Sequence, residues 1–193
     1  MKDLINHINN TYQLSETSWK ELIKLFKVKT YPSDYKLLEI GEKSKYFFFS
    51  LKGIVRSYKL CKDGKEFNSN IFTEKNYLGI FSSLISKKPS ELGLECLTEC
   101  ELVRINYDHF VSLSDKHIDL NILHRKNLRA FYVSLIMRER ELANLTSTDR
   151  YLALKERIPS IDNLISQKHI ASHLGITPVQ LSRLKKDLYS SNS

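Results

Sequence analysis

SQKHIASHLGITPVQLSRLKKDL, residues 166–188, is the most informative stretch of this sequence. It reads as two short helices joined by a tight turn at Gly175, because glycine readily adopts the left-handed conformation that ends a helix. Pro178 suits the first turn of the second helix, and Thr177 is its expected N-cap. Apolar or small residues recur at helical spacing along one side of each helix, at Ile170, Ala171, Leu174, Leu181, Leu184 and Leu188. The pattern predicts a helix-turn-helix, with an ordinary pair of core helices as the alternative.

The exposed side of the second predicted helix mixes hydrogen-bonding groups, small apolar groups and positive charge, which is the combination that a DNA major groove requires. Arg183 is suited to pair with guanine, Gln180 with adenine, and Val179 with a thymine methyl group. Ser182 is a further candidate for contact with bases. The side chains expected on phosphates are Lys168, Thr177, Lys185 and Lys186.

The composition describes a basic globular protein. In 193 residues, 30 Lys and Arg outnumber 22 Asp and Glu, so the formal net charge is +8 and the sequence pI is about 9.3. Such a charge favours polyanionic partners without identifying one. Hydrophobic residues make up 41% of the chain, which excludes disorder, and no apolar run is long enough to cross a bilayer. The N-terminus lacks the apolar segment of a secretory signal, so we expect a cytoplasmic protein.

Catalytic and metal-binding patterns are absent from the sequence. We find no nucleophile–base pair, carboxylate dyad or phosphate loop, and therefore predict that the chain is not an enzyme and carries no cofactor. No histidine occurs between Ile8 and Asp108, which excludes a roll that binds metal through strand histidines. Cys96 and Cys100 lie on one side of what reads as a single strand, so a redox or metal pair and ordinary buried thiols both stay open.

Between residues 28 and 106 the pattern changes to short runs of aromatic and branched residues separated by turns. Strands are predicted at 35–40, 46–51, 54–60, 66–71, 92–97 and 101–105, the last two forming a hairpin. Asp63-Gly64 is a strong hairpin signal, since a type I′ turn needs positive φ at both central residues. These strands predict an antiparallel roll, preceded by two helical pieces within 1–27, the second capped by Ser15 or Thr17.

Helical spacing returns after Tyr107 and continues to about Leu145. The predicted dimerisation helix, about 112–145, carries two apolar stripes, one for the roll and one for an identical helix. A long helix covered by its own domain is the alternative. Arg138 and Arg140 interrupt the apolar stripe, so a coiled coil with a second copy could not be continuous. The stripes are Leu128, Phe131, Leu135, Leu142 and Leu145, and then Ile122, Val133, Ile136 and Ala143. A capping box near 146–149 marks the expected boundary between domains 1–146 and 147–193.

The order of roll, long helix and helix-turn-helix resembles the Crp/Fnr family of bacterial transcription regulators, over nearly the whole chain. The resemblance implies an α+β fold, in which a cyclic nucleotide-binding-like jelly roll with flanking helices and a dimerisation helix precedes a small, mostly α DNA-binding domain. It also implies double-stranded DNA, a second copy of the chain and RNA polymerase as partners. The residues that carry it, besides 166–188, are Gly41, Lys52-Gly53, Arg56, the DGKE turn, Gly79, Pro89-Ser90 and Arg150.

The same resemblance places a small-molecule pocket inside the roll, beside the dimerisation helix. Members that bind cyclic AMP use a Gly-Glu pair and an Arg-Ser pair, whereas Gly79-Ile80 and Ser90-Glu91 stand here, and a carboxylate without an arginine would repel the phosphate. An unidentified effector other than cyclic AMP is therefore expected. The pocket implied by the resemblance comprises Gly79, Ile80, Phe81, Ser82, Ser90, Glu91, Leu135 and Ile136.

The leading hypothesis is a cytoplasmic, homodimeric transcription regulator that binds a pseudo-palindromic operator with half-sites about one helical turn apart. The alternative is a small-molecule sensor or interaction module with a vestigial DNA-binding tail. Pro178 and Val179 stand where better-known members place charged base readers, and the residues after 188 are too few for a β-hairpin wing. Effector, operator sequence and the sign of regulation stay open.

Overall fold

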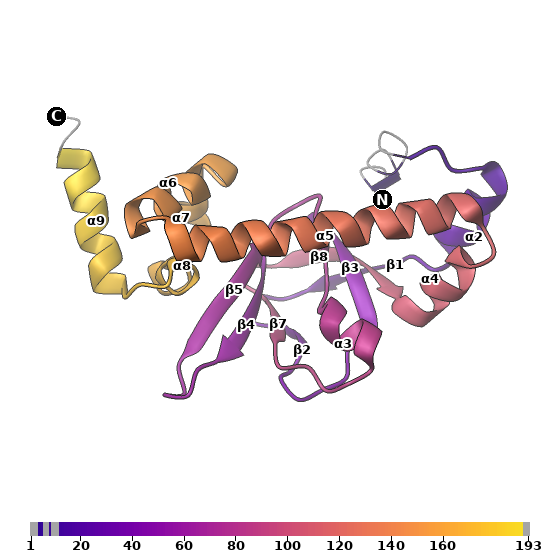
Figure 1. Cartoon of the computed structure of the whole chain (residues 1–193), viewed down its shortest axis with the longest axis horizontal. Coiled ribbons are helices and arrows are strands. Elements are labelled where there is room, and N and C mark those ends of the chain that lie inside the picture. The colour runs from indigo at the N-terminus through magenta and orange to yellow at the C-terminus, as the bar shows by residue number, and fades with distance from the viewer. Residues whose placement is uncertain (1–3, 6–7, 9–11, 191–193) are drawn as a thin grey trace.

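The computed structural model describes residues 4–5, 8 and 12–190, with only the backbone at 189. Two four-stranded antiparallel sheets form a roll, α5 runs along it, and the last helices gather at one end (Figure 1). The elements are α2 Glu16–Lys24, β1 Lys27–Tyr31, β2 Lys36–Leu38, β3 Tyr46–Lys52, β4 Val55–Leu60, β5 Glu66–Phe72, β6 Tyr77–Leu78, α3 Phe81–Ser86, β7 Gly93–Cys96, β8 Cys100–Asn106, α4 Tyr107–Ser114, α5 Ile118–Asn144, α6 Ser147–Arg157, α7 Ile161–Leu164, α8 Gln167–Leu174 and α9 Pro178–Ser190. The predicted α+β roll is confirmed.

Strand β3 explains the aromatic run FFF at residues 47–49. Successive side chains of a strand point to opposite faces of the sheet. Phe47 and Phe49 therefore join a core formed with α2, α4 and α5, which includes Leu22 and Phe110. Phe48 points the other way, into the interior between the two sheets. All three rings are buried because this sheet is covered on both faces.

The sheet orders correct one predicted pairing. One sheet has the order β1-β8-β3-β6 and the other β2-β7-β4-β5. The predicted hairpin of 92–97 with 101–105 is wrong, because β7 and β8 belong to different sheets and the turn between them crosses from one sheet to the other. The β4–β5 hairpin is confirmed, but only Gly64 in its turn has positive φ, so the turn is not type I′. β1, β6 and α3 were not predicted.

The helices before and after the roll follow the sequence closely. Ser15 caps α2 as expected, accepting a hydrogen bond from the N–H of Ser18, whereas the first predicted helical piece lies largely outside the described residues. The long helix begins at Ile118 and not near 112, because His117 has extended backbone angles and separates α4 from α5. Thr146 and Asp149 form the predicted capping box at the start of α6.

Helices α6 to α9 build a third apolar core, which also takes Ile54 and the partly buried Ile71 and Leu97 from the roll. Tyr151, Ile161 and Ile170 are among its fully buried members. Ile54, directly before β4, is 4% exposed and belongs to the same cluster. The C-terminal helices are therefore packed against the roll and not merely joined to it by α5.

Candidate nucleic-acid interface

Helices α8 and α9 are the two helices joined by a tight turn that the sequence predicts. Gly175 caps α8 with a φ of 72°. The N–H of Gln180 donates to Thr177 Oγ1 over 3.2 Å, and the N–H of Thr177 donates to Gln180 Oε1 over 2.8 Å. This capping box fixes the start of α9. Ala171 and Leu181, both fully buried, belong to the core between the helices.

One side of α9 is open to solvent, and the helix lies at the end of the molecule (Figure 1). Leu181 and Leu184 turn the opposite side toward the C-terminal core. Val179, in the first turn of α9, is 61% exposed. The predicted contacts that the structure brings onto this surface or next to it are Lys168, Thr177, Val179, Gln180, Ser182, Arg183 and Lys186, all exposed.

Lys185 is the one predicted DNA contact that lies elsewhere. Its ammonium group donates to Asp162 and to Gln167 Oε1 (2.8 Å), and its side chain is 17% exposed. Burial alone would raise the pKa of Asp162, but hydrogen bonds from Lys185, Tyr151 and Lys155 outweigh it and lower the pKa to about 2. The expectation for Lys185 is corrected: beside the apolar stripe of α9, its charge links helices of the C-terminal unit.

Gln180 is also partly engaged. Its amide oxygen accepts from both the N–H and the hydroxyl of Thr177. A bidentate pair with adenine needs both the oxygen and the nitrogen of the amide. The NH₂ group is therefore the part of Gln180 that is available to a base while the capping box is closed.

Helix α8 covers the outer edge of β5, the last strand of its sheet. The Ser172 hydroxyl donates to the carbonyl of Glu66 over 3.0 Å and accepts from the N–H of Asn68 over 2.9 Å. The Asn68 side-chain amide donates to the carbonyl of His169 over 3.0 Å. An edge strand has unpaired N–H and C=O groups, and Ser172 satisfies one of each. The contact thereby sets the position of α9 relative to the roll.

Arg56 lies behind this contact and is 4% exposed. Its guanidinium donates to Glu95 Oε2 over 2.8 Å, to Asn68 Oδ1 over 2.8 Å and to Glu66 Oε2 over 2.5 Å, and it lies 4.3 Å from the Tyr58 ring centroid. A buried charge is tolerated only when it is paired and hydrogen-bonded. The network orients the Asn68 amide, so that its NH₂ group faces α8.

Arg138 brings α5 into the same contact. Its guanidinium donates to the carbonyls of His173 and of Ser69 (3.3 Å), and Glu141 Oε2 lies 3.3 Å from Nη1. A register shift in β5 leaves Ser69 without a partner in β4, which frees its carbonyl. Arg138 therefore points toward β5 and α8, and it joins α5 to both.

Two histidines belong to this contact. Burial, together with the charge of Arg138, lowers the pKa of His173 to about 3, and burial also lowers the pKa of His169. A spacing of four residues places both on one helix face, and this face is turned inward, since His173 is only 3% exposed. Because burial disfavours the charged imidazole, protonation opposes the docking of α8.

The predicted effector residues of the roll are mostly occupied with packing. Ile80 is buried in the interior between the sheets together with Leu78 and Leu94. Gly79 is buried, and a Cβ added there would lie 3.1 Å from Phe47. The hydroxyl of Ser90, also buried, donates to the carbonyl of Leu92 over 2.6 Å.

The remaining predicted effector residues are spread over the surface. Ser82 and Glu91 are exposed, and the half-buried Phe81 lies 4.8 Å from Phe131 of α5 between ring centroids. Leu135 and Ile136 of α5 are 43% and 36% exposed. The structure thus brings Gly79, Ile80 and Ser90 into the interior but does not bring all eight residues together.

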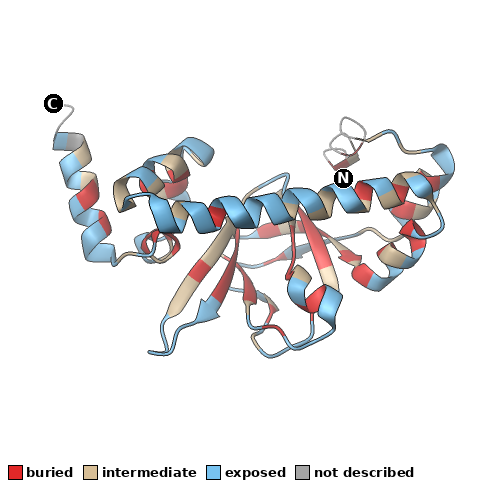
Figure 2. Cartoon of the chain, in the orientation of Figure 1, coloured by how far each residue is buried: buried red, intermediate tan, exposed pale blue. Residues whose placement is uncertain are grey.

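The side of α5 that faces away from the roll is exposed along much of its length (Figure 2), and large apolar side chains are exposed on the helix together with charged ones such as Arg129 and Arg140. The roll is contacted by Leu120 and Leu123, which are buried, and by Arg138. Of the predicted stripes, the first is partly turned toward the roll, since Phe131 contacts Phe81 and Leu128 is half-buried. The large apolar side chains left exposed on α5 are Ile118, Ile122, Tyr132, Val133, Leu135, Ile136, Met137 and Leu142.

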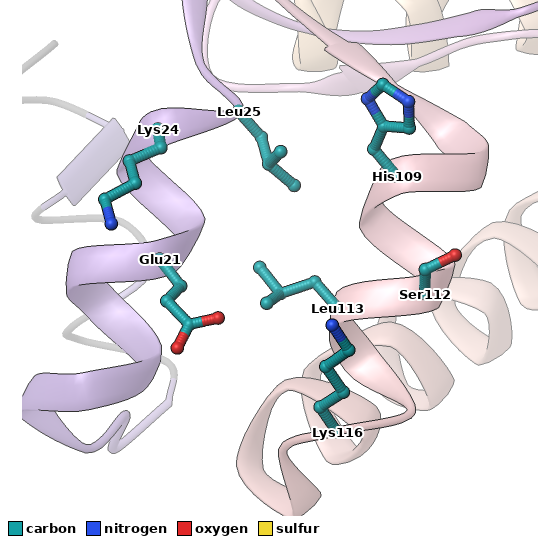
Figure 3. A pocket seen from close by; sticks show the side chains of 7 residues that line it. All are labelled: Glu21, Lys24, Leu25, His109, Ser112, Leu113 and Lys116. Atoms are coloured by element: carbon teal, nitrogen blue, oxygen red, sulfur yellow. The ribbon is translucent and has the colours of Figure 1, made fainter.

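Two open clefts lie away from the predicted sites. One, of about 400 Å³, separates α2 from α4, where Leu25 and Leu113 face each other (Figure 3). The other, of about 470 Å³, adjoins the loop between β2 and β3. Neither is lined by a residue predicted for DNA or effector binding.

Sequence reasoning missed the side chains that join α8 to the roll. Ser172 carries no signal of its role, because its partner Asn68 is 104 positions away in the chain. Arg138 did give a signal, since a charge within an apolar helix pattern needs a partner when it is buried. His173 could have been found by its place four residues from His169 and next to the buried Leu174.

Comparison with known proteins supports the fold. Residues 28–117 match the family model for the cyclic nucleotide-binding domain. FixK2 from Bradyrhizobium japonicum superposes with a TM-score of 0.74 at 17% identity, covering 86% of each chain. A protein from Eubacterium rectale assigned to the Crp/Fnr family of transcriptional regulators gives 0.74 at 13% identity, covering 96% of this chain and 88% of that one. A search of curated proteins returns no match.

A third similar structure has a ligand in its description. The c-di-GMP-responsive global regulator CLP from Xanthomonas campestris superposes with a TM-score of 0.66 at 19% identity, covering 92% of this chain and 93% of that one. Within the described part of this chain, no helix is long and apolar enough to span a membrane, and no group of three His, Cys, Asp or Glu side chains could hold a metal. The resemblance to the Crp/Fnr family is confirmed at the level of the fold.

We expect Ser172→Ala to loosen α8 from β5, because it removes both hydrogen bonds of the hydroxyl. The amide hydrogen of Asn68 should exchange roughly 5- to 30-fold faster, which corresponds to about 1–2 kcal/mol. Hydrogen exchange read by NMR measures this directly. Ser182→Ala, at an exposed position of α9, is the control. Unchanged protection of Asn68 in the Ser172 variant would contradict the assigned contact.

The buried His173 should make stability depend on pH. Its pKa is about 3 in the folded protein and about 6.5 when unfolded, so between these values the unfolded state binds the extra proton. The free energy of unfolding should therefore fall with decreasing pH more steeply in the wild type than in His173→Gln. Urea titrations from about pH 7 to 4.5 cover this window. The exposed His109→Gln should keep the wild-type slope; equal slopes in all three proteins would refute the account.

Proposed function

We propose that this chain, which has the fold of the Crp/Fnr-type regulators, is a homodimeric transcription regulator that binds a pseudo-palindromic DNA site through α9. The observation that carries this proposal is the open side of α9, whose polar and basic side chains are presented by a helix with a firmly buried opposite side. A net charge of +8 agrees with a polyanionic partner.

The proposed contacts divide into base readers and phosphate contacts. Arg183 is the main base reader, with Val179, Ser182 and the NH₂ group of Gln180 beside it. The phosphate contacts are Lys168, Thr177 and Lys186, with Thr177 at the positive N-terminal end of α9. Lys185 is left out because its ammonium group is bound to Asp162.

The outward side of α5 is the proposed dimer interface. Leu135 is 43% exposed, Val133 52% and Met137 51%, and burying such side chains against an identical helix is favourable. A twofold axis along α5 would present two copies of α9 to DNA, with half-sites about 34 Å apart. In this arrangement residues 1–146 form the sensing and dimerising domain and 147–193 the DNA-binding domain.

Regulation in this proposal does not use cyclic AMP. Ile80 offers a buried alkyl group where a carboxylate would hold the ribose, and Ser90 is followed by an exposed glutamate. An effector, if one acts on the roll, belongs to another chemical class. RNA polymerase is the proposed protein partner, in the cytoplasm.

Arg183→Ala is the first test of base readout. Loss of a bidentate contact with guanine should reduce the discrimination between cognate and random duplex DNA by about 1–3 kcal/mol. Fluorescence anisotropy titrations at fixed salt measure both affinities. Lys88→Ala removes the same charge from an exposed loop remote from α9 and should leave the discrimination unchanged. If Arg183→Ala behaves like this control, the proposed reader is wrong.

Leu135→Asp tests the dimer interface. In the proposed interface a carboxylate at this 43% exposed position of α5 would be buried without a partner, so sedimentation equilibrium should give the mass of one chain where the wild type gives two. Ile85→Asp, which replaces an exposed apolar side chain of α3, should remain dimeric. A dimer that survives in Leu135→Asp would place the interface elsewhere.

A further inference from the structure

The cleft of about 470 Å³ lies beside the loop that joins β2 of one sheet to β3 of the other. Leu38, Phe48 and Leu94 line it, and all three are buried members of the apolar cluster between the sheets. The same cluster holds Cys96 and Cys100, which lie at the end of β7 and the start of β8 and not in one strand, as the sequence suggested. Small-molecule sites have volumes of about 300–1,000 Å³ and a mostly apolar lining, and this cleft has both.

Positive charge predominates among the exposed side chains that line the cleft. Lys43 and Lys45 are exposed, and neither forms an ion pair with a described residue. Glu42 is the one carboxylate among the lining residues, and its Oε2 already accepts a hydrogen bond from the N–H of Glu39 over 3.0 Å. Two ammonium groups against one carboxylate leave an excess of positive charge at the cleft, which attracts anions.

Arg104 adds a third cation from within the roll. The strand register pairs Arg104 of β8 with Phe48 of β3, so both side chains point to the interior between the sheets. The guanidinium carbon lies 4.4 Å from the ring centroid of Tyr46, which lines the cleft. Arg104 is half-buried and forms no ion pair with a described residue. A partly buried cation is most favourable when an anion neutralises it.

We propose that this cleft binds a small organic carboxylate with an apolar body. The apolar body lies against Leu38, Phe48 and Leu94, and the carboxylate is held by the cations around Tyr46. The cleft shares no residue with the pocket that the family resemblance implies inside the roll. It is therefore a separate site, with a ligand of its own chemical class.

The loop beside the cleft is hydrogen-bonded to α3 and to the segment that follows α3. Ser44, which lines the cleft and is buried, donates its N–H to Ser83 Oγ of α3 over 3.0 Å. The N–H of Gly41 donates to the carbonyl of Ser90 over 2.7 Å, and the N–H of Ser90 donates to the carbonyl of Glu42 over 2.8 Å. A ligand that displaces the loop must therefore displace α3 or break these bonds.

Helix α3 in turn contacts α5. Its first residue is Phe81, whose ring centroid lies 4.8 Å from that of Phe131 in α5. Close-packed contacts transmit small displacements instead of absorbing them. We therefore expect a ligand in the cleft to change the affinity for DNA through α5, the proposed dimerisation helix. This regulatory part rests on the proposed function, whereas binding in the cleft does not.

The first experiment titrates the isotope-labelled full chain with cinnamate and, as the matched neutral control, with cinnamamide, and follows the backbone amides by NMR. Cinnamate should give saturable shifts at Leu38, Ser44, Tyr46 and Leu94. Cinnamamide should bind roughly 10-fold more weakly, because it lacks the charge. Absence of shifts, shifts confined to other parts of the chain such as the cleft between α2 and α4, or equal affinities of the two compounds would overturn the site.

Variants then test the cations. Lys43→Gln combined with Lys45→Gln changes only exposed side chains and should weaken cinnamate binding roughly 3- to 30-fold. Lys59→Gln combined with Lys62→Gln removes the same charge from exposed positions of the β4–β5 hairpin, which do not line the cleft, and should leave the affinity unchanged. Arg104→Gln tests the inner cation separately. Wild-type affinity in both the Lys43/Lys45 variant and Arg104→Gln would contradict the proposal.

Anisotropy titrations with selected DNA, with and without saturating cinnamate, test the regulatory part. The affinity of the wild type should change about 5-fold or more, and that of Ser83→Ala less, because this variant lacks the acceptor of the Ser44 N–H. Equal wild-type affinities with and without cinnamate would overturn the regulatory part, and equal effects in both proteins would overturn the route through α3. If the protein binds no DNA, the proposed function fails, and the NMR titration still decides the cleft.

Discussion

The unpaired edge of β5 is the constraint on which the position of α9 depends. A strand with a neighbour on one side only must find other partners for the N–H and C=O groups of its free edge, and here one serine hydroxyl of α8 binds one group of each kind. Arg56 and Arg138 reinforce the contact from the roll and from α5. The C-terminal helices therefore have a defined place on the roll, which a flexible hinge alone would not give them.

Helix α5 connects this contact to the rest of the molecule. One side of it packs on the roll through Leu120 and Leu123 and on β5 and α8 through Arg138, while the rest of the helix exposes large apolar side chains among charged ones. A helix with these two sides can couple a partner helix to the position of α9. Buried arginines and neutral histidines lie at one end of α5. The position of the C-terminal helices therefore depends on the charges of these side chains as well as on packing.

Local features were predictable from the sequence because local chemistry produces them. Gly175 ends α8, Thr146 and Asp149 close the capping box of α6, and the run of phenylalanines in β3 marks a strand covered on both faces. The assignment of β7 and β8 to different sheets, the docking of Ser172 on β5 and the inward turn of Lys185 were not predictable. The first two depend on partners that are distant in the sequence, and the third on a long side chain that can point toward solvent or toward the protein. The periodicity of apolar residues gives no information on either.

The central claim is that two copies of this chain read DNA through α9, and selection from random duplex DNA tests it most directly. The purified wild-type protein is incubated with the random pool, and the bound molecules are sequenced. The account predicts enrichment of an inverted repeat whose half-sites lie about one helical turn apart. Enrichment of a single unrepeated site, or of no sequence at all, would contradict it.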